Sequence, residues 1–249
     1  MDKWLILTYH AVDSRSSLTS ISPALFRWQM ESLAAQNLVG ISLADARDHL
    51  GRTGSFPENS VVLTFDDGYL SIMDEVLPVT LSLGFSATAF IVSDMVGMNA
   101  AQARAVNSDI DRDMMGWSQL EELVQAGFEI GSHTLHHPRL THLTRTEAEH
   151  QLSESKLKLQ QRLQVPVDSL AYPYGDLNQS VRNSASAYYK YGCTTRLGRN
   201  PVTIDPLQLK RVDAYFLTKP EVFLKVCAGK LEHYLHLRQY LREIKQIFS

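Results

Sequence analysis

Seven short runs rich in β-branched and aromatic residues alternate along this chain with longer segments whose apolar residues recur at helical spacing. The runs are Trp4 to Tyr9, Val61 to Phe65, Ala87 to Val92, Phe128 to Ser132, Ser169 to Tyr172, Gly192 to Thr195 and Leu209 to Asp213. A parallel neighbour strand is reached only across a connection of about a dozen residues, so strands that alternate with helices favour parallel pairing through right-handed crossovers. The pattern predicts an α/β fold, and a closed barrel of βα units accommodates it best.

Two candidate helix starts show the capping-box spacing, in which a side chain and a backbone N–H satisfy each other in the first turn. They are Ser118 with Glu121 and Thr144 with Glu147. The segment from Asn99 to Met115 is polar and only weakly periodic. It predicts a long loop on the face where the strands end.

Composition predicts one domain over residues 1–249, because 44% apolar residues suffice for one core and no linker or repeat marks a boundary. The tail from about Lys219 to Ser249 reads as two helices. A net charge of −3 argues against binding of nucleic acid or anionic lipid. The two cysteines, Cys193 and Cys227, fit neither a disulfide framework nor a thiolate metal site.

The N-terminal sequence bears on localisation. The apolar run from Trp4 to Leu7 is shorter than the roughly 7–15 residues of a signal peptide's hydrophobic region. No stretch approaches the ~20 apolar residues that a membrane-spanning helix needs. We therefore expect a cytoplasmic protein without a membrane span.

Two adjacent carboxylates, Asp66 and Asp67, follow the second run and precede Gly68. Successive side chains of a strand point to opposite faces, so only a turn at the strand end lets both acids face one cleft, and Gly68 permits that turn. The alternative is an ordinary Asp-Asp-Gly turn, which would be the simpler interpretation if the motif stood alone.

A second polar cluster follows the fourth run. His133 and His137 are four positions apart, where two imidazoles can meet one ion on a single helical turn, whereas His136 points elsewhere. Two histidines and one carboxylate form a ligand set of catalytic zinc that leaves a position open for water. Both clusters lie at strand ends, where parallel βα barrels build their active sites.

The third element is Ala171-Tyr172-Pro173-Tyr174-Gly175, which alone would be an ordinary loop. With it, the chain resembles the polysaccharide deacetylase family, also called the NodB-homology or carbohydrate esterase family four fold. Thr-Phe-Asp-Asp-Gly, His-Thr-x-x-His-Pro and Tyr-Pro-Tyr-Gly are similar to its first three motifs in order and separation, and the resemblance extends from Leu5 to about Tyr215. It implies a distorted (β/α)7 barrel, in agreement with the seven runs.

The resemblance also implies roles. Asp67, His133 and His137 would bind one divalent metal ion, usually zinc, with cobalt, nickel or manganese as alternatives. Asp66 would be the general base toward a water that attacks an amide carbonyl, and the backbone N–H of Tyr174 would be an oxyanion donor. The departing amine then requires a proton.

Two features depart from the family's pattern. Its third motif usually begins with an arginine that orients the catalytic aspartate, and Ala171 stands there; Arg211 could supply the guanidinium, although a surface ion pair is the alternative. The family's late acid histidine also has no counterpart, because His233 and His236 fall in the helical tail. His10 directly follows the first run, and Tyr9-His10 resembles the Tyr-His of deacetylases acting on poly-β-1,6-N-acetylglucosamine-type exopolysaccharides. We expect it to be the proton donor.

Aromatic residues complete the predicted site. Trp117, Tyr172 and Tyr174 are candidates for a wall on which a sugar ring stacks, and for Trp117 a place in the core is the alternative.

The sequence thus predicts a metal-dependent hydrolase that removes N-acetyl groups from an amino-sugar saccharide of bacterial polysaccharide or cell-envelope metabolism. Two alternatives stay open. One is a hydrolase of a non-sugar amide or formamide on the same barrel. The other is a saccharide-binding module that has lost catalysis.

Overall fold

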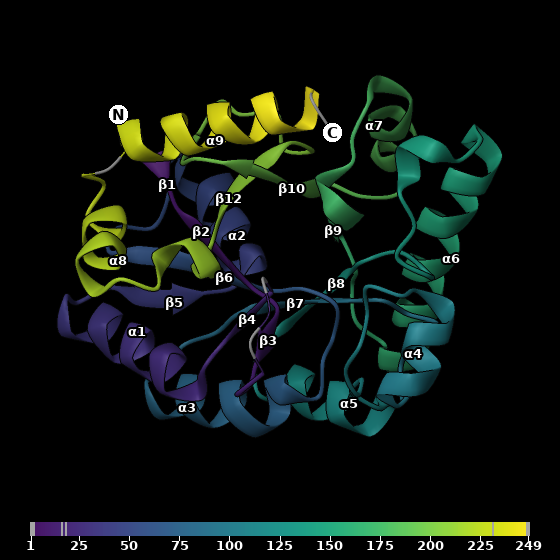
Figure 1. Cartoon of the computed structure of the whole chain (residues 1–249), viewed down its shortest axis with the longest axis horizontal. Helices are drawn as coiled ribbons and strands as arrows, with labels where there is room; N and C mark the ends of the chain where they lie inside the picture. Colours follow the sequence, from purple (N-terminus) through teal and green to yellow (C-terminus); the bar gives the residue numbers. More distant parts are fainter. Residues whose placement is uncertain (1–2, 16, 18, 231, 248–249) are drawn as a thin grey trace.

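A closed ring of seven parallel strands forms the centre of the computed structural model, which describes residues 3–15, 17, 19–230 and 232–247 (Figure 1). The ring strands are β2 (Ile6–Tyr9), β6 (Ser60–Phe65), β7 (Thr88–Ile91), β8 (Glu129–Ser132), β9 (Ser169–Ala171), β10 (Tyr191–Leu197) and β12 (Leu209–Asp213). Their order is β2-β12-β10-β9-β8-β7-β6, and pairing of β2 with β6 closes it. All seven predicted strands lie in this ring, and the prediction of a distorted (β/α)7 barrel is confirmed.

The strands that the sequence did not predict are two or three residues long, too short to show a period. β5 (Val39–Ile41) pairs with the first half of β6, while β7 pairs with its last two residues. β1 (Lys3–Trp4) pairs with β11 (Asn200–Pro201), and β3 (Ala11–Val12) pairs with β4 (Ser20–Ile21).

Helices surround the ring (Figure 1). They are α1 (Pro23–Ala35), α2 (Leu43–Thr53), α3 (Leu77–Ser82), α4 (Ala100–Val106), α5 (Trp117–Gln125), α6 (Arg145–Leu163), α7 (Gln179–Ser186), α8 (Pro220–Cys227) and α9 (Glu232–Ile247). Single turns of other helix types are η1 (Ile72–Val76), η2 (Leu140–His142), η3 (Pro173–Gly175) and η4 (Ala214–Leu217). In the described part of the chain, no helix is long and apolar enough to cross a membrane.

One of the two predicted capping boxes is confirmed. Thr144 accepts a hydrogen bond from the backbone N–H of Glu147, whose carboxylate accepts one from Thr144 N, at the start of α6. The prediction at Ser118 is wrong, because α5 begins earlier, at Trp117, and Gln119 accepts the N–H of Gly116. Glycine has no side chain to signal such a cap.

The segment from Asn99 to Met115 is not all loop. It contains α4, whose N-cap Asn99 forms a capping box with Gln102. Only Ala103 of this seven-residue helix is buried, so the segment shows no apolar stripe. The C-terminal tail contains the expected helices, α8 and α9; positions 231, 248 and 249 of that prediction lie outside the described residues. Gln239 of α9 accepts the backbone N–H of Leu197, which ties α9 to β10.

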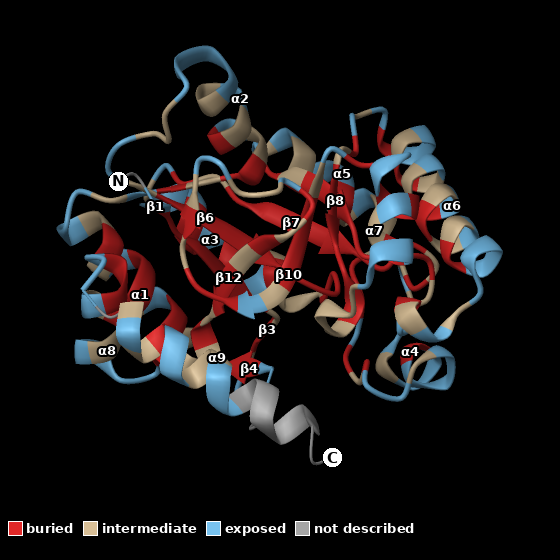
Figure 2. Cartoon of the chain, turned by 90° about the horizontal axis from the view of Figure 1, so that it is seen from above, coloured by how far each residue is buried: buried red, intermediate tan, exposed pale blue. Residues whose placement is uncertain are grey.

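Alternate residues of the ring strands face two different cores. Ile6, Val62, Phe90, Cys193 and Leu209 pack together in a cluster inside the barrel. Residues that alternate with these along the strands belong to the outer core, which also contains residues of the surrounding helices; examples are Leu5, Leu7, Leu63, Ala89 and Val212. Figure 2 shows the result, with buried strands at the centre and exposed residues on the outer helices.

The barrel interior leaves no room for a side chain at Gly131. It is the register partner of Phe90, and a Cβ built on Gly131 would lie 2.5 Å from Phe90 Cε1. We expect Gly131→Ala to lower the free energy of unfolding by roughly 1–3 kcal/mol, because overpacking forces the ring or the strand to shift. Urea denaturation measures this.

Gly51→Ala is the matched control. Gly51 lies in α2, and a Cβ added there would have no heavy atom within 4 Å. Alanine should raise stability by roughly 0.5–1 kcal/mol, because glycine is a poor helix former. Equal effects of the two substitutions would contradict the packing argument.

Candidate active site

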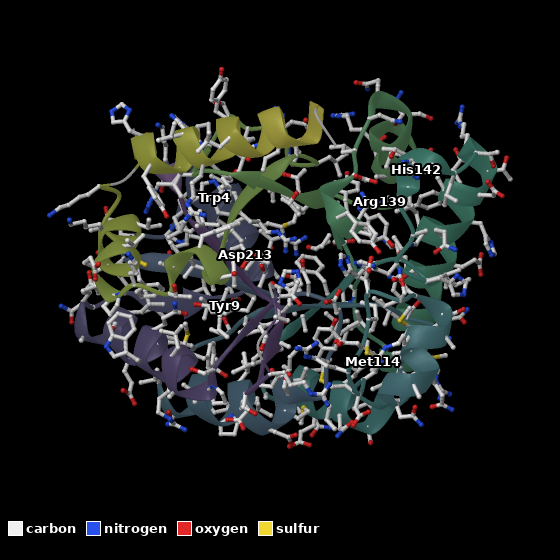
Figure 3. The ribbon with its side chains drawn as sticks, viewed as in Figure 1. Trp4, Tyr9, Met114, Arg139, His142 and Asp213 are labelled. Atoms are coloured by element: carbon white, nitrogen blue, oxygen red, sulfur yellow. The ribbon has the colours of Figure 1, made fainter. Side chains whose placement is uncertain are left out.

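The carboxyl ends of the ring strands surround a cavity of about 350 Å³. Eight of the nine predicted site residues line it: His10, Asp66, Asp67, His133, His137, Tyr172, Tyr174 and Arg211. Asp213 of β12 and Arg139, from the loop that follows β8, also line the cavity and lie well apart from each other (Figure 3). The first and the last ring strands in the sequence, β2 and β12, thus meet at one site.

Asp67, His133 and His137 form a compact group of buried ligand atoms, all within 4.8 Å of one another. Asp67 Oδ1 lies 3.5 Å from Nε2 of His133 and 3.6 Å from Nε2 of His137. Zinc ligands at about 2.0–2.2 Å in a tetrahedron are separated by roughly 3.3–3.6 Å. The two distances from Asp67 and the donor types therefore fit a divalent cation.

The two histidines are not on a helical turn, so that expectation was wrong. Residues 133–138 form a loop in which Thr134 (φ 69°) and His137 (φ 58°) adopt left-handed backbone. Thr134 N donates to Ser132 Oγ, and His137 N donates to Thr134 Oγ1. These bonds fold the loop so that both imidazoles face Asp67.

A hydrogen bond from the other ring nitrogen orients His133, and a side chain holds the backbone of His137. His133 Nδ1 lies 2.7 Å from the carbonyl oxygen of Ala171, to which it donates, so Nε2 is the ring nitrogen that faces Asp67. Asn107 Nδ2 donates to the backbone oxygen of His137 at 2.7 Å and lies 3.4 Å from its Nδ1. Asn107 was missed by sequence reasoning, since it follows the short α4 and belongs to no motif.

Local charges favour forms of Asp67 and His137 that suit cation binding. Burial works to lower the pKa of His133, but its hydrogen bond to Asp67 and the charge of Asp66 raise it, so a cation would displace a proton there. Burial and the nearby His133 lower the pKa of His137 to about 4, so its imidazole is neutral at pH 7. Burial opposes ionisation of Asp67, but its hydrogen bond to His133 and the surrounding imidazoles hold its pKa well below the usual range. A carboxylate and a neutral imidazole are both forms in which these groups bind metals.

Arg211 and Asp66 form a buried two-pronged ion pair. Nη1 and Nη2 of Arg211 lie 2.7 Å from Oδ1 and Oδ2 of Asp66, and the two side chains are 2% and 3% exposed. Arg211 also donates to the carbonyl oxygen of Thr194 and to Thr64 Oγ1. The alternative of a surface pair is therefore wrong. Burial works to raise the pKa of Asp66, but the charge of Arg211 outweighs it and lowers that pKa.

His10 stands beside this pair. Its Nε2 lies 3.8 Å from Asp66 Oδ2, and its Nδ1 is buried with no hydrogen-bond partner among the described residues. Asp213, the last residue of β12, lines the same cavity, and burial raises its pKa. Sequence reasoning placed Asp213 at a strand end and gave it no role.

The three aromatic candidates differ in position. Tyr174 (φ 60°) lies between His137, 4.7 Å from its ring, and the guanidinium of Arg139 at 4.1 Å, and its hydroxyl donates to Asp109. Tyr172 lines the cavity but is fully buried, and its hydroxyl has no partner among the described residues. The prediction for Trp117 is wrong.

Trp117 lies outside the cavity because α5 carries it to the outer side of the barrel. There the charged groups of Arg162 and Lys158 lie 5.1 and 6.0 Å from its ring. Its ring also packs against the outer core, as the alternative interpretation expected. The sequence around Trp117 gave no sign of which side of the barrel it would face.

Comparison with known proteins identifies the family. The model of the polysaccharide deacetylase family matches residues 53–192, more than half of the chain, so this protein belongs to that family. YxkH of Bacillus subtilis (strain 168), which carries the same family name, is 26% identical over 194 residues, which are 78% of this chain and 64% of YxkH. The chain thus spans less than two thirds of that relative.

Another sequence relative and two solved structures are similar to this chain. The poly-beta-1,6-N-acetyl-D-glucosamine N-deacetylase of Staphylococcus epidermidis is 24% identical over 76% of this chain and 71% of its own length. The crystal structure of BC0361, a polysaccharide deacetylase from Bacillus cereus, superposes with a TM-score of 0.75 at 26% identity, covering 91% of this chain and 69% of that one. IcaB from Ammonifex degensii gives a TM-score of 0.72 at 23% identity over 92% and 97%.

Substitution of Arg211 measures how strongly the buried charge of Asp66 depends on this arginine. We expect Arg211→Met to lower the free energy of unfolding at pH 7 by roughly 3–5 kcal/mol, because Asp66 is left as an unpaired buried charge. Without Arg211, burial raises the pKa of Asp66 above its unfolded value, so the folded variant gains stability as the pH falls. The deficit relative to wild type should therefore be smaller at pH 5 than at pH 7. Urea denaturation at both values measures it.

The control is Arg182→Met, which breaks the partly exposed pair with Asp205. Arg182→Met should lower the free energy of unfolding several times less than Arg211→Met, since exposed ion pairs contribute little to stability. A pH-independent deficit for Arg211→Met would contradict the assignment to Asp66.

Proposed function

We propose that this protein is a metal-dependent N-deacetylase of an N-acetylated amino-sugar saccharide. The observation that carries the proposal is the position of Asp66, which Arg211 holds beside the candidate metal ligands Asp67, His133 and His137 in one cavity. The named activity of the Staphylococcus epidermidis relative supports this substrate class. The cavity of about 350 Å³ falls within the range of about 300–1,000 Å³ typical of small-molecule sites.

The cation supplies one part of the chemistry. A divalent ion bound by the three ligands, zinc being preferred by such a set, would act as a Lewis acid toward the amide carbonyl and lower the pKa of water. The Nε2 atoms of His133 and His137 and Asp67 Oδ1 are the atoms that would hold it.

Asp66 is the general base. Arg211 lowers its pKa, so the carboxylate is deprotonated at neutral pH, and the two-pronged contact fixes its direction. It takes the proton from the water that attacks the amide carbon. The carbon–nitrogen bond then breaks to give acetate and a free amine, and the backbone N–H of Tyr174 is the donor that we assign to the developing oxyanion.

His10 is the general acid. Its Nε2 is near Oδ2 of Asp66 and the residue lines the same cavity, so a proton can reach the amine nitrogen from that side. An amine leaves far more readily than an amide anion at neutral pH, which is why the reaction needs this group.

The first test measures acetate release from a panel of N-acetylated oligosaccharides by zinc-loaded protein. We expect release by wild type, loss on removal of the metal, and a fall in kcat of about 10²–10⁴-fold in Asp66→Asn, since that variant lacks the base. Asp66→Asn should still bind one zinc per chain, whereas His133→Ala should bind it at least about 10-fold more weakly by calorimetry.

Several outcomes would decide against the proposal. Zinc-loaded protein that releases no acetate from any saccharide would favour a non-sugar amide as substrate. Full activity of Asp66→Asn would remove Asp66 from its role. His136→Ala is the control for histidine loss, because His136 pairs with Asp94 outside the group of ligands.

Substitution of His10 separates acid catalysis from metal binding. We expect His10→Ala to lower kcat by about 10²–10⁴-fold while zinc stoichiometry is unchanged, because the imidazole delivers the proton and lies outside the ligand group. For a substrate with a better leaving group, such as an acetate ester, His10→Ala should lower kcat much less. Equal loss on ester and amide would assign the acid role to another group, and Asp213→Asn would then be examined in the same way.

A further inference from the structure

A second cavity, of about 530 Å³, lies directly beside the catalytic one. The two share Tyr174, Asp176 and Thr195 as lining residues, so they adjoin along these three residues. The second cavity lies between the start of α7, the end of β10 and Gln239 of α9. Asn178, Gln179 and Arg196 at its edge are exposed, so it is a groove open to solvent.

The lining of this groove suits a polar, uncharged ligand rich in hydroxyl and amide groups. Leu177 is the single aliphatic side chain among its thirteen lining residues, all of them in the described part of the chain. Most of the others carry amide, hydroxyl or guanidinium groups, which are the partners that sugar hydroxyls and N-acetyl groups use. The groove has no aliphatic wall that would favour a lipid tail.

Part of the lining is held rigidly. Asp205 accepts hydrogen bonds from Arg182 Nε at 2.8 Å, from Gln208 Nε2 at 2.9 Å and from Leu207 N. These donors lower the pKa of Asp205 to about 2, so it remains ionised and keeps Arg182 and Gln208 in place. Side chains fixed before binding lose less conformational entropy when a ligand arrives.

The charges of the groove do not all cancel. Arg182 is paired with Asp205, and Asp176 is paired with Arg139. Arg196 adds a further positive charge at the edge, and among the described side chains it forms no ion pair with a carboxylate. A cationic ligand would therefore be disfavoured near Arg196.

We propose that this groove binds the sugar unit next to the one that is deacetylated, and that Arg196 makes it favour a unit that is still acetylated. The inference rests on the proposed function, because it names the substrate as a chain of at least two units. An N-acetyl unit is neutral, whereas its deacetylated product is an ammonium ion at neutral pH. Repulsion by Arg196 would then lower the rate at units whose neighbour has already reacted, and the product would be deacetylated in part.

The test compares kcat/KM for N-acetylglucosamine with that for its β-1,4- and β-1,6-linked trimers. We expect at least one trimer to exceed the monosaccharide by about 10-fold, which corresponds to one or two added hydrogen bonds. Gln208→Ala and Arg196→Ala should lower this trimer-to-monomer ratio by about 3–10-fold, because each removes up to one such bond. Arg52→Ala, an exposed arginine on α2 that lines neither cavity, should leave the ratio unchanged.

A second comparison tests the charge. Wild type should prefer the fully acetylated trimer over one with a single glucosamine unit beside the reacting unit by about threefold, the effect of a like charge some 6 Å away in water. Arg196→Glu should abolish or reverse that preference. An unchanged preference in Arg196→Glu would overturn the role of Arg196.

The outcomes separate this inference from the proposed function. Acetate release that is equal for monomer and trimers would overturn the groove and leave the function standing. If no saccharide releases acetate, wild type can be titrated with the same intact compounds by calorimetry. Tighter trimer binding that Arg196→Ala weakens would then support the groove without the reaction, and equal binding of all compounds would overturn it.

Discussion

The ion pair between Arg211 and Asp66 is the interaction on which the site depends. It joins β12 to β6 across β2, the strand that lies between them in the ring. Thr8 of β2 adds a hydrogen bond to Thr64 of β6, next to the guanidinium. A buried charge pair gains little net stability, because desolvation offsets its attraction, but removal of one partner is costly. The pair therefore fixes the relative positions of three strands more than it stabilises the fold.

Backbone strain is concentrated at the same place. Of the seven non-glycine residues with positive φ in the described chain, four belong to the site: Asp67, Thr134, His137 and Tyr174. Left-handed backbone costs roughly 1–2 kcal/mol per residue, and it persists where the surroundings over-determine the conformation. Hydrogen bonds to side chains provide this restraint in the loop of His133 and His137. This strained loop brings the ligand atoms together without a helix. For this reason the expectation that His133 and His137 lie on one helical turn was wrong.

The fold and the central site residues could be predicted from the sequence, because the ring strands are short runs rich in apolar and β-branched residues between helical segments, and the acidic and histidine motifs directly follow two of them. Very short strands such as β5, and helix α4 with one buried residue, left no periodic signal. The positions of Trp117 and Asn107 depend on where a helix starts and how a loop folds back. Capping at Gly116, which no side chain signals, was enough to misplace the start of α5.

The departure from the family's third motif has a physical explanation in this geometry. Ala171 and Arg211 both belong to the barrel interior, and Ala171 is fully buried beside Phe90 and Cys193. Asp66 offers two carboxylate oxygens, and Arg211 occupies both. A second arginine at position 171 would be a buried charge without a partner, at a cost of several kcal/mol. The arginine at position 211 therefore requires a small, uncharged residue at position 171. The guanidinium of Arg211 reaches Asp66 from β12, while the carbonyl oxygen of Ala171 orients His133.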